Sequence, residues 1–110
     1  MNKKMPKSTV SSWNESVDGP VSENAMRMKI ESLGYSVHRY VYAPGTMFPE
    51  HTHGVDKIDG VVSGCFQIVL EGTAHDLRAG DWIVVPAEAL HSAKVIGHEP
   101  VISLDGVRKK

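Results

Sequence analysis

The chain has 110 residues and a formal net charge of −1 at pH 7, which predicts one domain with a modest core and gives no electrostatic reason to expect nucleic acid or an anionic membrane as partner. No apolar run is long enough to span a bilayer, and no secretory signal opens the sequence. Cys65 is the only cysteine, so no intramolecular disulfide can form, and we expect a cytoplasmic protein.

The first segment, residues 1–20, is polar and rich in lysine and serine, so we expect a mobile N-terminal arm. Trp13 is the exception in this arm. A large aromatic side chain in a polar segment either packs against the folded domain or a second subunit, or is simply exposed, and the sequence does not decide between these.

Residues 21–33 are expected to form a short helix that precedes the strands. Met26, Ile30 and Leu33 recur at spacings of four and three residues, which places them on one face. Ser22 can cap the start of the helix, and Gly34 suits the position just beyond its end. A helix this short is marginal alone, so we expect its apolar face to pack against the strands.

The rest of the chain predicts a series of short strands separated by turn residues. Residues 35–42 alternate between two faces and are rich in residues that favour strands. Further strands are expected around His51 and at residues 56–63, 65–70, 73–77, 82–85, 91–96 and 100–104. Many short strands at intervals of about ten residues are typical of an antiparallel barrel or sandwich, and periodicity alone does not choose between the two.

Two histidines stand one residue apart, at positions 51 and 53. In a strand, residues two apart point to the same face, about 7 Å from each other along the backbone. Neutral imidazole is the commonest metal ligand in proteins, so the pair suits one metal ion. His91 is the leading candidate for a third imidazole. The alternative interpretation of the pair is two solvated histidines at a strand end.

These histidines lie within two glycine-bounded patterns that resemble the two motifs of the cupin family. The first motif is matched by Gly45, His51, His53 and Gly64, and the second by Gly80, Pro86 and His91. The resemblance covers roughly residues 35–105. It implies an all-β fold, the double-stranded β-helix or cupin jelly-roll barrel, in a single domain over residues 21–110 that includes the N-terminal helix. It also implies a homodimer paired through sheet edges.

The chain departs from the family pattern at the usual glutamate ligand, which is Lys57 here. Three arrangements stay open. In the first, a divalent transition metal (zinc, iron, nickel, manganese or copper) is held by His51, His53 and His91 alone. In the second, Asp56 or Asp59 replaces the missing carboxylate ligand. In the third, no metal binds, and the histidines contact a ligand directly. We rank the all-histidine site first.

Strand alternation puts Lys57 and Asp59 on the same face as the two neighbouring histidines. A buried lysine needs a counter-charge, so Lys57 either pairs with Asp59 inside the barrel or contacts an anionic group of a small-molecule ligand. The sequence therefore supports a metal-dependent oxygenase or isomerase acting on a small organic acid, a non-catalytic binding or sensing protein without metal, or a structural dimer. It does not settle whether the protein is an enzyme.

Overall fold

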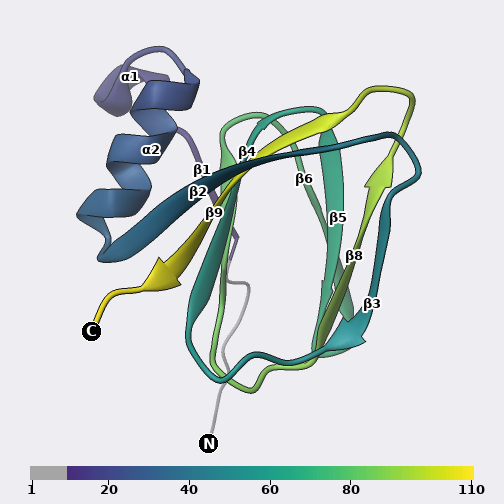
Figure 1. Cartoon of the computed structure of the whole chain (residues 1–110). Helices are drawn as coiled ribbons and strands as arrows, with labels where there is room; N and C mark the ends of the chain where they lie inside the picture. The colour runs from purple at the N-terminus through teal and green to yellow at the C-terminus, as the bar shows by residue number, and fades with distance from the viewer. Residues whose placement is uncertain (1–9) are drawn as a thin grey trace, which may run out of the picture.

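The computed structural model of the chain describes residues 10–110. These residues form nine strands and two helices (Figure 1), and no helix among them is long and apolar enough to cross a membrane. In chain order the elements are β1 (Val10–Ser12), α1 (Glu15–Asp18), α2 (Glu23–Ser32), β2 (Tyr35–Tyr42), β3 (Met47–His51), β4 (Lys57–Ser63), β5 (Cys65–Leu70), β6 (Thr73–Leu77), β7 (Asp81–Val85), β8 (His91–Ile96) and β9 (Val101–Arg108).

The strands make two antiparallel sheets that face each other. One has the order β1-β7-β4-β9-β2 and the other the order β3-β8-β5-β6. From β2 onward each strand is followed by a strand of the other sheet, with one exception: β5 and β6 are consecutive in the same sheet and form a hairpin. The result is the double-stranded β-helix of a jelly roll, preceded by short helices, which confirms the fold expected from the sequence.

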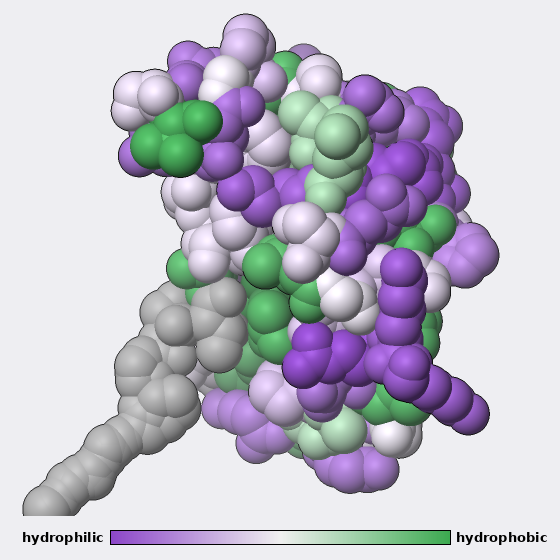
Figure 2. All heavy atoms as spheres, turned by 90° about the vertical axis from the view of Figure 1, so that its left-hand side faces the viewer, coloured by the Kyte–Doolittle hydropathy of each residue, from purple (hydrophilic) through white to green (hydrophobic). Residues whose placement is uncertain are grey.

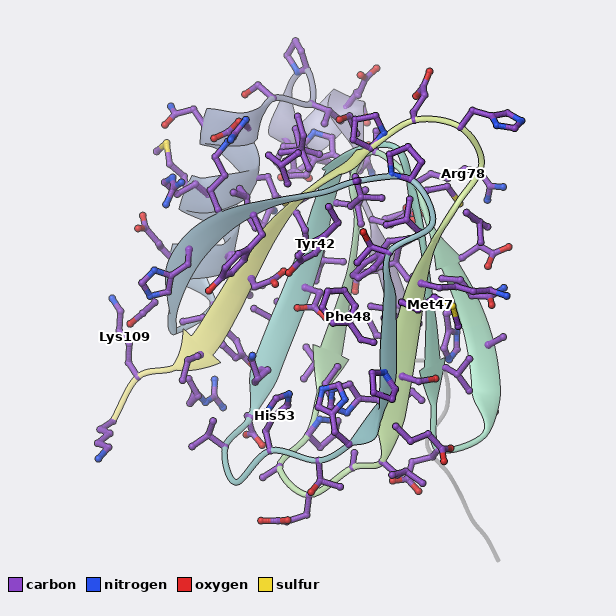
Figure 3. The ribbon with its side chains drawn as sticks, turned by 45° about the vertical axis from the view of Figure 1, so that its right-hand side comes forward. Tyr42, Met47, Phe48, His53, Arg78 and Lys109 are labelled. Atoms are coloured by element: carbon purple, nitrogen blue, oxygen red, sulfur yellow. The ribbon has the colours of Figure 1, made fainter. Side chains whose placement is uncertain are left out.

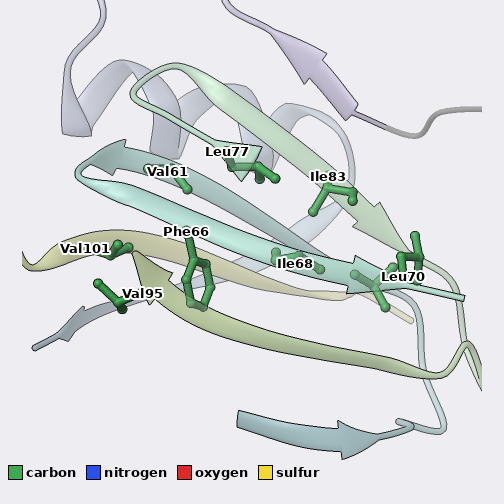
Figure 4. Close-up of a cluster of buried hydrophobic side chains, with 9 residues drawn as sticks. Val61, Phe66, Ile68, Leu70, Leu77, Ile83, Val95 and Val101 are labelled. Carbon is green, nitrogen blue, oxygen red and sulfur yellow. The ribbon is translucent and has the colours of Figure 1, made fainter. Parts of the chain in front are cut away.

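The main hydrophobic core lies between the two sheets (Figure 4). It forms because alternate residues of each strand point inward; in β5 these are Phe66, Ile68 and Leu70. Its buried members are Val61, Phe66, Ile68, Leu70, Leu77, Ile83, Val85, Val95 and Val101. Phe66 and Val85 also line a pocket, so the core ends where this pocket begins.

Helix α2 covers the outer face of the five-stranded sheet and forms a second core there. Ser22 caps its start, with the side chain accepting from the Ala25 amide at 3.0 Å, as the sequence predicts. Met26 and Ile30 are fully buried against the sheet. The helix comes this close because Gly60 lacks a side chain: a Cβ at that position would lie 2.8 Å from Ile30 Cδ1.

The expected mobile arm over residues 1–20 differs from the structure in its second half. Residues 10–12 pair with β7 as a strand, and α1 follows; residues 1–9 lie outside the described part of the chain. Trp13 explains the difference. Its ring packs edge-on against Trp82 with centroids 6.3 Å apart, and its indole N–H donates to the Gly19 carbonyl at 2.8 Å. Packing of the Trp13 ring and strand pairing therefore order residues 10–20, which composition alone predicts to be mobile.

Two strand boundaries matter for the site. Strand β3 ends at His51, so His53 lies in the loop that follows and not on the same strand as expected. Strand β9 extends to Arg108, beyond the expected residues 100–104. It is paired on both sides, with β2 and with β4, and these two ladders carry the strand through Asp105 and Gly106, residues that rarely favour strands.

Candidate metal and ligand site

Three histidines converge at one end of the barrel. His51 ends β3 and is the direct partner of His91, the first residue of β8, while His53 follows from the adjoining loop. The ring centroids are 4.2 to 5.0 Å apart. One nitrogen from each ring lies within 4.8 Å of the others. The structure therefore brings together the three residues that the sequence selects as metal ligands.

Backbone carbonyls orient two of these rings. The Nδ1 of His51 lies 2.7 Å from the Pro49 carbonyl oxygen, and the Nδ1 of His91 lies 2.9 Å from that of Ala89. A carbonyl can only accept a hydrogen bond, so each Nδ1 must carry the proton. In the neutral ring the lone pair is then on Nε2, which is the arrangement in which histidines bind metals.

The surroundings also favour the neutral rings that a metal requires. Burial lowers the pKa of His53, and the charges of Lys57 and the other two histidines lower it further. Burial likewise lowers the pKa of His91, against the opposing effect of its bond to the Ala89 carbonyl. Both rings are therefore neutral at pH 7 and need lose no proton to coordinate a cation.

The loops that carry His53 and His91 are tied together at Glu88. Its amide donates to the His53 carbonyl at 2.8 Å, and its φ of 67° lies in the left-handed region. The family motif has glycine at this position, where such a φ carries little cost. On the same loop the Ala87 amide donates to an Asp56 carboxylate oxygen at 2.7 Å. Asp56 therefore has a structural role in this loop.

Lys57 and Asp59 project from β4 into the same pocket. Within the described residues, the Lys57 ammonium group donates no hydrogen bond and has no carboxylate within 4.0 Å; the ion pairs there are Lys29–Asp18 and Arg39–Glu23. The alternative in which Lys57 and Asp59 satisfy each other as an ion pair therefore does not describe this geometry. The ammonium group faces the pocket without a direct counter-charge.

Asp59 is paired instead with Asp105, its direct partner on β9. Burial raises the pKa of Asp59 well above its usual range, and the charge of Asp105 and hydrogen bonding between the two carboxyl groups raise it further. Asp105 accepts two further bonds, from the Tyr42 hydroxyl at 2.8 Å and from the Ser103 hydroxyl at 2.5 Å. We call Asp59 and Asp105 the carboxyl pair.

These groups line one cavity of about 250 Å³ between the sheets. Figure 3 shows its two ends, with His53 near the loops, Tyr42 at the far end and Phe48 between them. One wall is aromatic, because Tyr42 packs against Phe48 and Phe66 with ring centroids 5.0 and 5.4 Å apart. The remaining lining residues are Tyr40, His51, Lys57, Asp59, Val85, His91, Ala93 and Asp105.

Sequence reasoning missed Asp105 and the tyrosines of β2 as pocket residues. Alternation places Tyr40 and Tyr42 on one face of β2, but it cannot say which face is inside. Asp105 lies one residue past the expected end of the last strand. The sequence does carry one signal for Asp105. Polar Ser103 and Asp105 flank apolar Leu104, and this alternation continues the strand pattern through position 105.

The three histidines fit a divalent transition metal. They would supply three nitrogen ligands, with lone pairs on Nε2 in two of them, and would leave further coordination positions open. Among the described residues, the group able to hold a metal consists of these histidines without a carboxylate. That favours the all-histidine arrangement over replacement of the missing glutamate by Asp56 or Asp59.

Comparisons with known proteins bear on the family and the fold. The family model for the cupin domain matches residues 38–106. No curated protein sequence matches the chain. Among solved structures, a cupin protein from Bacteroides fragilis is 26% identical with a TM-score of 0.61, and the match covers 69% of this chain and 66% of that one.

Two further solved structures share the fold at lower identity. KdgF from Halomonas sp. is 24% identical with a TM-score of 0.61, covering 70% of this chain and 72% of that one. The DMSP lyase DddQ from Ruegeria pomeroyi is 20% identical with a TM-score of 0.62, covering 70% of this chain but only 39% of the lyase. A fourth match, to a protein from Streptococcus pyogenes, covers 66% of that protein. Several of these chains are therefore longer than the matched region.

Proposed function

Since this chain belongs to the cupin family, we propose that it is a small metal-binding cupin that acts on a small organic acid. His51, His53 and His91 hold a divalent transition metal, and the adjoining cavity takes the acid. The proposal rests on one observation: three imidazoles converge in the same cavity as the ammonium group of Lys57. Among the described residues, no carboxylate lies within 4.0 Å of that ammonium group. The cavity is small, which suits a ligand below drug size.

Lys57 is assigned to the anionic group of the ligand. Its charge acts on His53 and His91 and also on Asp59, so the ammonium group lies within reach of the histidines. A carboxylate placed there would gain a charge-assisted hydrogen bond from the ammonium group. It would also offset the positive charge that otherwise disfavours a cation at the histidines.

A metal at this site would supply Lewis-acid activation of a bound oxygen atom. The chain's own residues would orient the substrate: Lys57 holds its carboxylate, and the aromatic wall of Tyr42, Phe48 and Phe66 packs against its carbon chain and excludes water. This division of roles is compatible with oxygenase-like or isomerase-like chemistry.

Elemental analysis of untagged protein purified without chelator tests the metal assignment. We expect near-stoichiometric transition metal in the wild type and in a control with His75→Ala and His98→Ala, two histidines outside the cluster. The double variant His51→Ala, His53→Ala should contain none. Absence of metal from the wild type even after supplementation with zinc, iron(II), nickel, manganese and copper would refute the metal site.

A non-catalytic binding protein without metal is the second candidate. It is favoured by one observation, the positive charge of Lys57 close to the histidines, where the family has a carboxylate ligand. Butyrate serves as a probe of the cavity. Binding that survives removal of metal by a chelator, and that is weakened about tenfold by Lys57→Met but not by Lys94→Met on the exposed face of β8, would support this candidate.

The proposal includes a homodimer in the cytoplasm. Strands β1, β2, β3 and β6 are sheet edges, and edge strands need to be covered or paired. On the edge strand β2, Val41 is 53% exposed. By contrast, the face that carries the helices is largely hydrophilic, and its hydrophobic residues form only separate groups (Figure 2). Light scattering at micromolar concentration tests the dimer, and a monomer mass would refute it.

A further inference from the structure

The far end of the cavity presents polar groups that the proposed function does not use. The carboxyl pair lies on the wall formed by β4 and β9. Two carboxylates this close cannot both be ionised without strong repulsion, so the pair holds one proton between them. The question is which oxygen atoms remain available to a molecule in the cavity.

The hydrogen bonds locate the proton on Asp59. Asp105 accepts from the hydroxyls of Tyr42 and Ser103, one on each of its oxygens. Bonds of this kind stabilise the ionised form of the carboxyl group that accepts them. Asp105 is therefore the carboxylate, and Asp59 is the neutral acid that donates to it.

This assignment leaves an uncharged acceptor on Asp59. A neutral carboxylic acid has one O–H and one carbonyl oxygen. The O–H of Asp59 is used by Asp105, and within residues 10–110 no other hydrogen bond reaches the side chain of Asp59. Its carbonyl oxygen is thus an uncharged acceptor with no protein donor, on the wall of a cavity that has Lys57 two residues along the same strand.

We propose that the carboxyl pair is a hydroxyl-binding subsite and that the ligand of this pocket is a small hydroxylated carboxylate. Its carboxylate faces Lys57 and the histidines, and its hydroxyl donates to Asp59. Side chains two apart on a strand are separated by about 7 Å along the backbone, which a short hydroxy acid can bridge. The inference rests on the proposed function, because it takes the same cavity as the ligand site.

The test compares two acids that differ by one hydroxyl, 3-hydroxybutyrate and butyrate, on the full chain by titration calorimetry. One hydrogen bond to a neutral acceptor predicts that 3-hydroxybutyrate binds wild type about fivefold to tenfold tighter than butyrate. In Asp59→Leu this ratio, measured on the variant itself, should fall to near one. In Asp59→Asn the ratio should persist, because the amide N–H₂ can donate to Asp105 and the amide oxygen can face the cavity.

A second test uses only the wild-type protein, so it does not depend on whether a variant folds. The side-chain carboxyl ¹³C resonance of Asp59 should shift on saturation with 3-hydroxybutyrate and stay in place with butyrate. Equal affinities for the two acids, or an unmoved Asp59 resonance with 3-hydroxybutyrate bound, would overturn this inference and leave the proposed function standing. Failure of both acids to bind would overturn the anionic-ligand pocket itself, and the subsite with it.

Discussion

Replacing Asp59 by asparagine should make the protein progressively more stable than wild type as the pH rises. The pKa of Asp59 is raised well above its usual range by burial and by the neighbouring charge of Asp105. Folded wild type therefore keeps a proton on this side chain at pH values where the unfolded chain has lost it. Asparagine at this position mimics the protonated acid and binds no proton in either state.

The sign and size follow from proton linkage. An unfolded aspartate has a pKa of about 3.9. Above that pH, and up to the raised pKa of the folded state, folding of wild type takes up one proton. The free energy of unfolding of wild type therefore falls by about 1.4 kcal/mol per pH unit relative to Asp59→Asn. Below about pH 4 the difference between the two proteins is constant, because both states of wild type are then protonated.

Urea unfolding followed by tryptophan fluorescence at pH 4, 5, 6 and 7 measures this difference. The other titrating groups are shared by the two proteins, so their contributions cancel. Asp76→Asn, at an exposed aspartate on β6, is the matched control with which the slope of Asp59→Asn is compared. A difference between wild type and Asp59→Asn that does not change from pH 4 to pH 7 would refute a proton held on the carboxyl pair.

Three other substitutions test the packing and the loops. Gly60→Ala should destabilise the fold by about 1–3 kcal/mol, because its Cβ would lie 2.8 Å from a side-chain atom of α2; Gly54→Ala, whose nearest contact is 3.9 Å, should be close to neutral, and equal effects in urea unfolding would contradict this reasoning. Glu88→Gly should raise the thermal midpoint, with a gain of about 1 kcal/mol, since φ at this position is 67°; a lower midpoint would mean that the side chain itself stabilises the loop. Tyr42→Phe should cost about 1–3 kcal/mol in urea unfolding, because it removes a donor to the carboxyl pair, and an unchanged midpoint would argue against that bond.

The fold could be predicted from sequence because its cues are local. Turn residues separate strands of regular length, and pairs such as Glu71-Gly72 adopt the positive φ values, 48° and 86°, that a tight hairpin requires. The two glycine-bounded histidine motifs then chose the barrel from among the all-β architectures. The capped helix at residues 21–33 was equally local, and it appears as α2.

The site could be predicted only where its members lie in those motifs. His51, His53 and His91 belong to them, and Lys57 and Asp59 follow from alternation along the next strand. Their convergence in one cavity is a fact of the structure, while their roles as ligands remain predictions. Asp105 and Tyr42 could not be found in this way, because they join the cavity through the pairing of β9 with β4 and β2, strands far apart in sequence.

The main-chain bonds to the histidine rings have a consequence for how this pocket can change. The acceptors that fix Nε2 as the free nitrogen of His51 and His91 are the carbonyls of residues 49 and 89, each two positions before its ring. No side-chain replacement can delete a carbonyl group. Substitutions of the side chains that line the cavity can therefore change the substrate, while the tautomers of His51 and His91, and with them the coordination chemistry, stay the same.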